Sequence, residues 1–327
     1  MTSRNEQKHY FYLEMAKLLA AGFGIREAAA VLKETRLPAY QLELLNGLEN
    51  GLAQGMSIAA AYSQEGLGVS EIEKHILNAG EKGGRLASAF QHLAEYFGLL
   101  ENARHRLLKS ILYPALVLHL GIFISVVPGA ILNDTGGTWN RLLVTLLCVY
   151  ASGFALFLAV RAVGKLSVHK EGVDVFINRI PLIGPVRKNL AMARFTKVYH
   201  ACLLAGLTIS ETTTMAASAA HSGSILAAGK KLSRLAFNGD LLGPAFVSED
   251  TFPKAFARSY ATAELSGGLD KDMERWSSLY QQQAEATLRT LSIMLPKIVG
   301  GLVMLFVAWK ILGFWSDYYG KLESITE

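Results

Sequence analysis

Leu18–Glu27 reads LLAAGFGIRE and Cys202–Glu211 reads CLLAGLTISE, and this pair of stretches decides the fold. When they are placed in register, Gly22 matches Gly206 and both stretches end in a glutamate. Apolar residues three and four positions apart precede each glycine, as is typical of an amphipathic helix that ends in a glycine cap. Self-similarity of this kind predicts two copies of one helical unit.

The similarity continues along both copies at nearly the same separation. Glu81–Leu86 (EKGGRL) matches Glu264–Leu269 (ELSGGL), and Ser110–Pro114 (SILYP) matches Ser292–Pro296 (SIMLP). The last pair stands at the start of apolar stretches, so the repeated unit includes the beginning of a membrane helix. No window alternates convincingly with the period of a strand, and we therefore expect an all-α fold.

The chain is more apolar than is usual for a soluble enzyme, with 51% hydrophobic and only 18% charged residues. Ile111–Asn133 contains no Asp, Glu, Lys or Arg and a single histidine, His119, and Leu142–Val160 contains no charge. Each is long enough to cross a hydrocarbon core of roughly 30 Å. A polar turn around Gly136 and Gly137 would join the two spans into a hairpin.

A third apolar stretch, Ile298–Trp315, is interrupted by Lys310, whose long side chain can reach the headgroups from one end of the span. We therefore expect two repeated cytoplasmic helical-bundle domains with three transmembrane helices. The expected segments are a first cytoplasmic domain at 1–108, a transmembrane hairpin at 109–163 with helices at about 111–132 and 142–160, a second cytoplasmic domain at 164–290, a third transmembrane helix at 291–318 and a short periplasmic tail at 319–327.

Charge placement predicts a cytoplasmic N-terminus. Positive residues flank the outer ends of the hairpin, whereas the turn carries Arg141 balanced by Asp134. No apolar run near the N-terminus is long enough for the core of a cleavable signal. The flanking positive residues are Arg104, Arg106, Lys109, Arg161, Lys165 and Lys170.

No motif for catalysis or cofactor binding is recognisable. The nearest approach to a nucleotide loop, Gly223–Lys231, has the wrong glycine spacing, and the histidines show no metal-ligand pattern. Cys148 and Cys202 lie apart, and the basic pI of about 9.1 comes without a basic stripe interleaved with aromatics. We therefore expect no enzyme, no cofactor, no metal site and no nucleic-acid partner.

The residues repeated at matched helix ends are the candidates for a partner contact or a structural motif. The glutamates have two interpretations, contact with a partner or ion and a hydrogen bond or salt bridge at a helix end, and the structural one is favoured. Glycines at these breaks need no ligand. The candidates are Gly22, Glu81, Gly84, Gly206, Glu264 and Gly267.

Two residues inside the predicted spans also have alternative interpretations. His119 could join a polar pathway, but a hydrogen bond to a neighbouring helix is favoured. Lys310 could pair with another subunit, but extension of its side chain towards the headgroups explains it without a partner.

These features resemble the type II secretion F and type IV pilus inner-membrane platform proteins. The resemblance covers nearly the whole chain and rests on the order and duplication of several weak motifs. Gly83 replaces the usual serine in the first copy of the glycine motif, and Ala263 replaces the first glycine in the second copy. The short N-terminus is similar to the smaller platform proteins of type IVb, toxin-coregulated-type pili. The motifs are Leu18–Ile25, Leu203–Ile209, Gly80–Leu86, Ala263–Leu269 and Ile180–Val186.

The resemblance implies a multi-pass protein of the bacterial inner membrane that couples a cytoplasmic ATPase to pilin extraction and polymerisation. It implies a homo-oligomer in the lipid bilayer that contacts a hexameric assembly ATPase, other inner-membrane assembly proteins, and pilin or pseudopilin.

Two other functions compete with this interpretation. A small membrane transporter or channel component also has repeated units, but three spans are few and neither copy has a pair of broken helices. An intramembrane protease would need a paired catalytic constellation within the spans. Gene neighbourhood would discriminate, because an assembly ATPase and a prepilin favour the platform.

Overall fold

The computed structural model describes residues 3–35, 37–62, 68–132, 135–169 and 171–326. Within these ranges every regular element is a helix and no strand occurs, which confirms the predicted all-α fold. The chain divides into two compact units. Unit one comprises Met1–Asn102, its first half, and Leu166–Leu288, its second half; unit two comprises Ala103–Lys165 and Arg289–Glu327.

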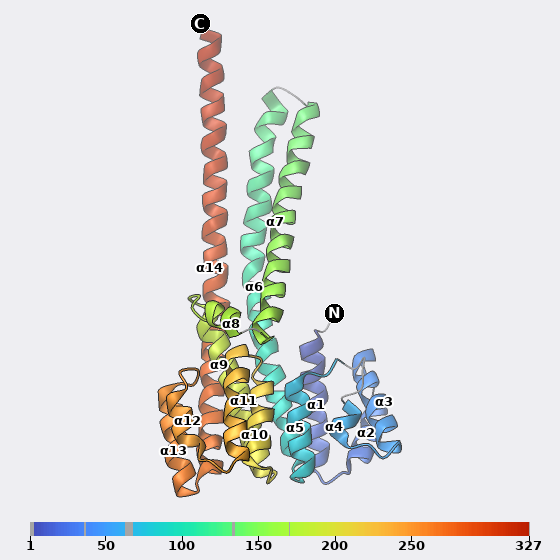
Figure 1. The fold of residues 1–327 in the computed structure, drawn as a ribbon. Coiled ribbons are helices and arrows are strands. Elements are labelled where there is room, and N and C mark those ends of the chain that lie inside the picture. Colours follow the sequence, from blue (N-terminus) through green and yellow to red (C-terminus); the bar gives the residue numbers. More distant parts are fainter. Residues whose placement is uncertain (1–2, 36, 63–67, 133–134, 170, 327) are drawn as a thin grey trace. The chain divides into compact units, whose positions relative to one another are not determined.

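The helices of the first half follow one another through short connections, in the order that Figure 1 colours from blue to cyan. The last of them, α6, also supplies residues to unit two. The bounds are α1 (Arg4–Ala20), α2 (Ile25–Lys33), α3 (Ala39–Ala53), α4 (Ile58–Tyr62), α5 (Glu71–Lys82) and α6 (Leu86–Leu132).

The second half follows α7 (Thr135–His169) and has the same succession of long and short helices after α8. Its last helix, α14, also supplies residues to both units. The bounds are α8 (Glu171–Ile177), α9 (Ile183–Leu204), α10 (Ile209–Ala219), α11 (Gly223–Phe237), α12 (Leu242–Ser248), α13 (Lys254–Ser266) and α14 (Leu269–Thr326).

Helices α1 and α9 end at the glycines that the sequence comparison paired. Gly22 has φ +95° and Gly206 has φ +71°, a left-handed conformation that suits glycine. The amide of Phe23 donates to Leu18 O, and the amide of Leu207 donates to Cys202 O, both at 3.1 Å. These bonds satisfy carbonyls of the last helical turn, so the predicted glycine ends are confirmed.

Aromatic side chains fill the core of each half. Phe11, Tyr12, Tyr62, Phe90 and Phe97 are buried in the first half. Ring pairs such as Tyr12 and Phe97, whose centroids are 5.7 Å apart, place large apolar areas in contact. Fully burying one such side chain contributes about 1.5–3 kcal/mol, so burial of these apolar faces is the main stabilising term.

The core of the second half contains a second aromatic cluster. Phe246 contacts the rings of Phe252 and Tyr260 at centroid distances of 4.8 and 4.3 Å. The hydroxyls of Tyr199 and Tyr260 hydrogen-bond at 2.7 Å, which satisfies both inside the core.

The two halves pack on each other within unit one, where α5 contacts α9 and α10. A Cβ added to Gly83 would lie only 2.9 Å from Ala205 Cα, so the glycine permits a close approach of the two backbones. Ser218 Oγ and His75 Nε2 are 2.6 Å apart across the same contact. The predicted cytoplasmic segments therefore share one packed unit.

Unit two contains the apolar parts of α6, α7 and α14. By length and composition, two described helical stretches can cross a membrane, Leu86–Phe123 and Leu269–Gly313. In α7 the described apolar stretch, Leu143–Ala155, is shorter, so the second span stays a prediction, as do the predicted segment boundaries. A Cβ on Gly121 would meet Val307 Cγ2 at 2.3 Å, which shows how closely α6 and α14 pack within this unit.

Two expectations about helix limits have different outcomes. Helices α6 and α14 run without a break past Pro114 and Pro296, as predicted. The turn expected near Gly136 and Gly137 is misplaced, because α7 already begins at Thr135 and both glycines are helical. A glycine costs only about 1 kcal/mol within a helix, which the helical hydrogen bonds outweigh.

Candidate functional site

Glu81, in the last turn of α5, caps the N-terminus of α4 in the first half. Its carboxylate accepts hydrogen bonds from Ile58 N at 2.8 Å and Ala59 N at 3.2 Å. Ser57 Oγ accepts from the next amide, Ala60 N, at 3.1 Å. The first amides of a helix have no partner within it, and negative charge is favourable there. Glu81 thereby holds a helix of only 5 residues in place.

Glu264, in α13, makes the same contact with α12 in the second half. It accepts from Leu242 N at 2.9 Å and from Gly243 N at 2.6 Å. A Cβ on Gly243 would lie 2.7 Å from Ala261 Cα, so the two helices touch through their backbones next to the carboxylate. The repeated glutamates therefore have equivalent hydrogen-bonding roles.

Gly84 and Gly267 stand three residues after the two glutamates and end α5 and α13. Their φ values are +65° and +71°, in the left-handed region where a side chain is strained. The next amide donates back to the last helical turn in each copy, by the bonds Arg85 N to Gly80 O at 2.8 Å and Gly268 N to Ala263 O at 2.9 Å.

All the repeated candidates thus lie at helix ends. The structure brings Glu81 next to Gly84 and Glu264 next to Gly267 at equivalent caps, while Gly22 and Gly206 end other helices. Both carboxylates are already engaged by backbone amides, which supports the structural interpretation of the glutamates. A contact of these residues with a partner stays a prediction.

The two candidates inside the predicted spans have partners within unit two. His119 Nε2 lies 2.6 Å from Tyr150 Oη on α7, and its Nδ1 lies 2.7 Å from Ala115 O. This is the hydrogen bond to a neighbouring helix that the sequence favoured. Lys310 Nζ lies 5.8 Å from the ring centre of Trp309, a cation–π distance.

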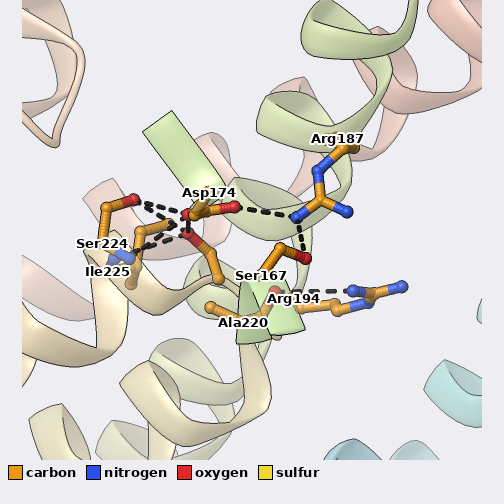
Figure 2. Close-up of polar contacts among 8 residues, drawn as sticks. Ser167, Asp174, Arg187, Arg194, Ala220, Ser224 and Ile225 are labelled. Atoms are coloured by element: carbon orange, nitrogen blue, oxygen red, sulfur yellow. Dashed lines mark hydrogen bonds and ion pairs between the residues drawn. The ribbon is translucent and has the colours of Figure 1, made fainter. Parts of the chain in front are cut away.

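A polar cluster around Asp174 was not predicted from the sequence. Figure 2 shows Asp174 of α8 between Ser224, at the start of α11, and Arg187 of α9. Asp174 Oδ1 accepts from Arg187 Nη2 at 2.8 Å, and Oδ2 accepts from Ser222 Oγ at 2.5 Å and from Ser224 Oγ at 2.8 Å. Arg187 Nη2 also donates to Ser167 Oγ at 2.8 Å.

Asp174 is a buried anion with its partners already in place. Only 1% of the residue is exposed. Burial opposes ionisation, but hydrogen bonds from Ser222, Arg187 and Ser224 outweigh it and lower the pKa of Asp174. The carboxylate thus ties α8 and α9 to the N-terminus of α11. From the sequence, only Ser222 could be predicted, because serine is a preferred N-cap residue. No sequence pattern indicates which distant residues Asp174 contacts.

A cavity of about 660 Å³ opens beside this cluster. Positive side chains from α8–α9 and carboxylates line it together with the buried apolar residues Met192, Ile225 and Phe252. This size suits a small organic molecule. The charged lining residues are Arg179, Arg187, Lys188, Arg194, Glu171, Asp174 and Asp250.

A buried ion pair in the first half was also not predicted from the sequence. Lys8 Nζ lies 2.8 and 2.6 Å from the two oxygens of Glu73, and Tyr12 Oη donates to the same carboxylate. Burial lowers the pKa of Lys8 although Glu73 opposes the shift. The pair joins α1 to α5, which are distant in sequence.

Another ion pair connects the two halves. Lys197 of α9 donates to Glu95 of α6 at 3.1 Å and to Gln281 of α14 at 2.8 Å. Nearby, Arg194 Nε donates to Tyr96 Oη at 2.8 Å. The nearby His92, whose Nδ1 lies 3.8 Å from Glu95 Oε2, and the charge of Lys197 hold the pKa of Glu95 well below its usual range, even though burial opposes this.

Comparison with known proteins identifies proteins that are similar in sequence to this chain. Residues 11–132 match the family model described as type II secretion system (T2SS), protein F. The chain is 27% identical over 325 residues to the type 4 fimbrial assembly protein PilC of Pseudomonas putida, which covers 90% of this chain and 80% of that protein.

Other relatives align over a similar extent. The type IV pilus assembly protein TapC of Aeromonas hydrophila is 22% identical, with 89% of this chain and 77% of that protein covered. The type II secretion system protein F of the same organism is 23% identical, with 91% and 83% covered.

The matches agree with the helices described above. Pilus and secretion proteins both appear among the relatives, and the matched family is one of non-catalytic inner-membrane platforms that work with other components of the machinery. The apolar helices α6 and α14 fit a membrane location. Over most of its length the chain is therefore similar to type II secretion protein F and to type IV pilus assembly proteins.

Proposed function

We propose that this platform protein couples a cytoplasmic assembly ATPase to the extraction of pilin from the inner membrane and to its polymerisation. The observation that carries the proposal is the similarity to pilus assembly proteins over 90% of the chain. The same similarity also favours a platform over a transporter or channel.

The proposed coupling runs through helices that belong to both units. Helix α6 contributes to unit one up to Asn102 and to unit two beyond it, and α14 does so up to Leu288. A partner that displaces unit one would act on unit two through these helices. The chain would then transmit motion without hydrolysing nucleotide itself.

The proposal includes a multi-pass arrangement with a cytoplasmic N-terminus. Reporter fusions after Thr138 and after Glu327 should then both report the periplasm, because an odd number of spans separates the N-terminus from each. A cytoplasmic signal after Glu327 would contradict the third span.

The proposed partners are a hexameric ATPase, other inner-membrane assembly proteins, and pilin or pseudopilin, with the chain itself as a homo-oligomer. Apolar side chains on unit two remain largely exposed in the single chain, for example Leu112 at 70% and Leu305 at 69%. Lipid or partner helices in the bilayer would cover such surfaces.

Site-specific photo-crosslinking in cells tests both kinds of contact. A crosslinking residue at Phe237, 83% exposed in unit one, should capture soluble assembly proteins including the ATPase. The same residue at Leu305 should capture pilin or a second copy of the chain. The ATPase crosslink at Phe237 should disappear when the ATPase gene is deleted, and a pilin crosslink at Leu305 should disappear when the pilin gene is deleted.

The matched functional test is complementation of a strain that lacks this chain. Wild-type protein should restore piliation or secretion. Restored uptake of a small solute with unchanged pili would support the transporter, and absence of any crosslink to an ATPase in a complemented strain would contradict the proposed coupling.

A further inference from the structure

The cavity beside Asp174 carries more positive charge than its structural ion pairs use. Arg187 is paired with Asp174 at 2.8 Å, and Asp250 is already paired with Lys254 at 2.7 Å. Among the described residues, no ion pair engages Arg179 or Lys188, both exposed and both in the cavity wall. An anion entering the cavity therefore meets uncompensated positive charge.

Two buried polar atoms in the cavity wall are left without a hydrogen bond in the described part of the chain. They are Arg187 Nε, a donor, and Asn178 Oδ1, an acceptor. A buried polar group without a partner costs about 1–3 kcal/mol, so such atoms in a native protein call for an occupant. The occupant must bring an acceptor to Arg187 and a donor to Asn178.

The shape of the cavity adds a third requirement. Its volume of about 660 Å³ exceeds what a bare inorganic ion fills, and Met192, Ile225 and Phe252 supply an apolar wall. The ligand must therefore combine a charged group with an organic body.

Phosphate suits the charged part of such a ligand. Arginine presents a planar fork of donors that matches phosphate oxygens, and here Nη2 of Arg187 is held by Asp174 and Ser167. The guanidinium is thus fixed in orientation, and its Nε is left without a hydrogen-bond partner among the described residues. Lysine and arginine at the wall add charge without a fixed geometry.

We propose that this cavity binds an organic phosphate, a phosphate ester whose body carries hydroxyl or amine donors. Arg187 Nε and the cations Arg179 and Lys188 receive the phosphate, Asn178 accepts from the body, and the apolar wall packs against its carbon skeleton. A soluble nucleoside phosphate and the headgroup of an anionic phospholipid share this chemistry.

Direct binding to the purified full chain in nonionic detergent tests the proposal. The probes are adenosine monophosphate and short-chain phosphatidylglycerol, each followed by calorimetry and by the melting temperature from tryptophan fluorescence. At least one probe should bind at one site per chain at millimolar concentration or below, raise the melting temperature and bind more weakly in high salt. Binding of the nucleotide identifies a soluble source, and binding of the lipid identifies a headgroup.

Paired variants separate a specific site from general charge. Arg179→Gln with Lys188→Gln should weaken the binding of the active probe by about tenfold or more, because hydrogen bonds to charged groups are lost. Lys230→Gln with Arg258→Gln removes the same charge from exposed positions outside the cavity wall and should leave binding unchanged. Arg187→Lys keeps a cation beside Asp174 but removes Nε, and it should also weaken binding by about tenfold.

The proposal is overturned if neither probe binds at millimolar concentration, or if both double variants bind as the wild type does. If Arg187→Lys fails to fold, the comparison of the two double variants still decides. The experiment uses the chain alone, so its result is independent of any contact with an ATPase or pilin.

Discussion

Lys8 Nζ lies 2.6 Å from Glu73 Oε2, and neither side chain is more than 5% exposed. In the second half, the residues that align with this pair are Met192 and Phe256, both buried and apolar. One copy of the helical unit thus joins its first and fifth helices by an ion pair, and the other joins the equivalent helices, α9 and α13, by apolar packing.

Lys8→Met should destabilise unit one strongly, because it leaves the carboxylate of Glu73 buried without its cation. We expect a loss of about 3–5 kcal/mol in the free energy of unfolding. Thermal or urea unfolding of the purified chain measures it.

The double variant Lys8→Met with Glu73→Leu is the control, since replacing a whole buried ion pair by apolar residues is often close to neutral. It should recover most of the lost stability. Equal stability of the single and double variants would show that the unpaired charge is not the cause.

The local features of the fold could be predicted from the sequence, whereas the long-range pairings could not. Glycine at Gly22 and Gly206 and the apolar spacing before them determine helices and their ends through interactions within a few residues. The sequence also predicted, correctly, that the helix continues past Pro114. Which residues meet across the fold depends on packing, and apolar spacing shows only that a face is buried.

The candidate site shows the same division. The duplication drew attention to Glu81 and Glu264, but their partners are amides more than twenty positions earlier, on a different helix. The role of Asp174 could not be predicted, because its hydrogen-bond partners come from other helices, α9 and α11. The shared packing of the two halves through Gly83 was missed because a glycine in a loop is equally consistent with a simple turn.

Glu264→Ala should release the N-terminus of α12 and lower stability by about 1–2 kcal/mol, the usual cost of losing an N-terminal cap. Glu81→Ala should have the same effect on α4. Glu285→Ala, an exposed residue of α14, is the control and should be neutral. Protease sensitivity in membranes and the melting temperature of the pure protein report the loss.

Charge reversal separates structure from partner contact at the same positions. Glu264→Lys should be depleted in membranes in parallel with any loss of piliation if the cap is its only role. Normal membrane levels with reduced piliation and reduced coprecipitation of the ATPase would instead establish a partner contact.

Gly267→Ala should cost about 1–2 kcal/mol, because it forces a side chain into the left-handed region. Its neighbour Gly268 is a matched control. Gly268 has no positive φ, and an added Cβ would meet only Ser266 Oγ at 3.6 Å. Gly268 precedes the first residue of α14, where alanine caps less well than glycine, so Gly268→Ala should cost less than Gly267→Ala in unfolding experiments. An equal loss in both variants would argue against the cap.

Stability should fall as the pH drops from about 6.5 to 4, and His221 should account for part of this. Burial, with a contribution from Arg194, lowers the pKa of His221 to about 4, whereas the unfolded chain has a value of about 6.5. Because the folded pKa is the lower one, the unfolded state binds the proton first, and the contribution of neutral His221 is complete above pH 6.5 and is lost below it.

His221→Asn suits the position, since asparagine tolerates the φ of +53° found there. The variant should flatten the dependence of unfolding free energy on pH by up to about 1.4 kcal/mol per pH unit in this window. His75 and His200, whose pKa values burial also lowers, should maintain a residual slope. Unfolding curves at several pH values for wild type and variant measure the difference, and identical slopes would show that the pKa of His221 is the same in the folded and unfolded states.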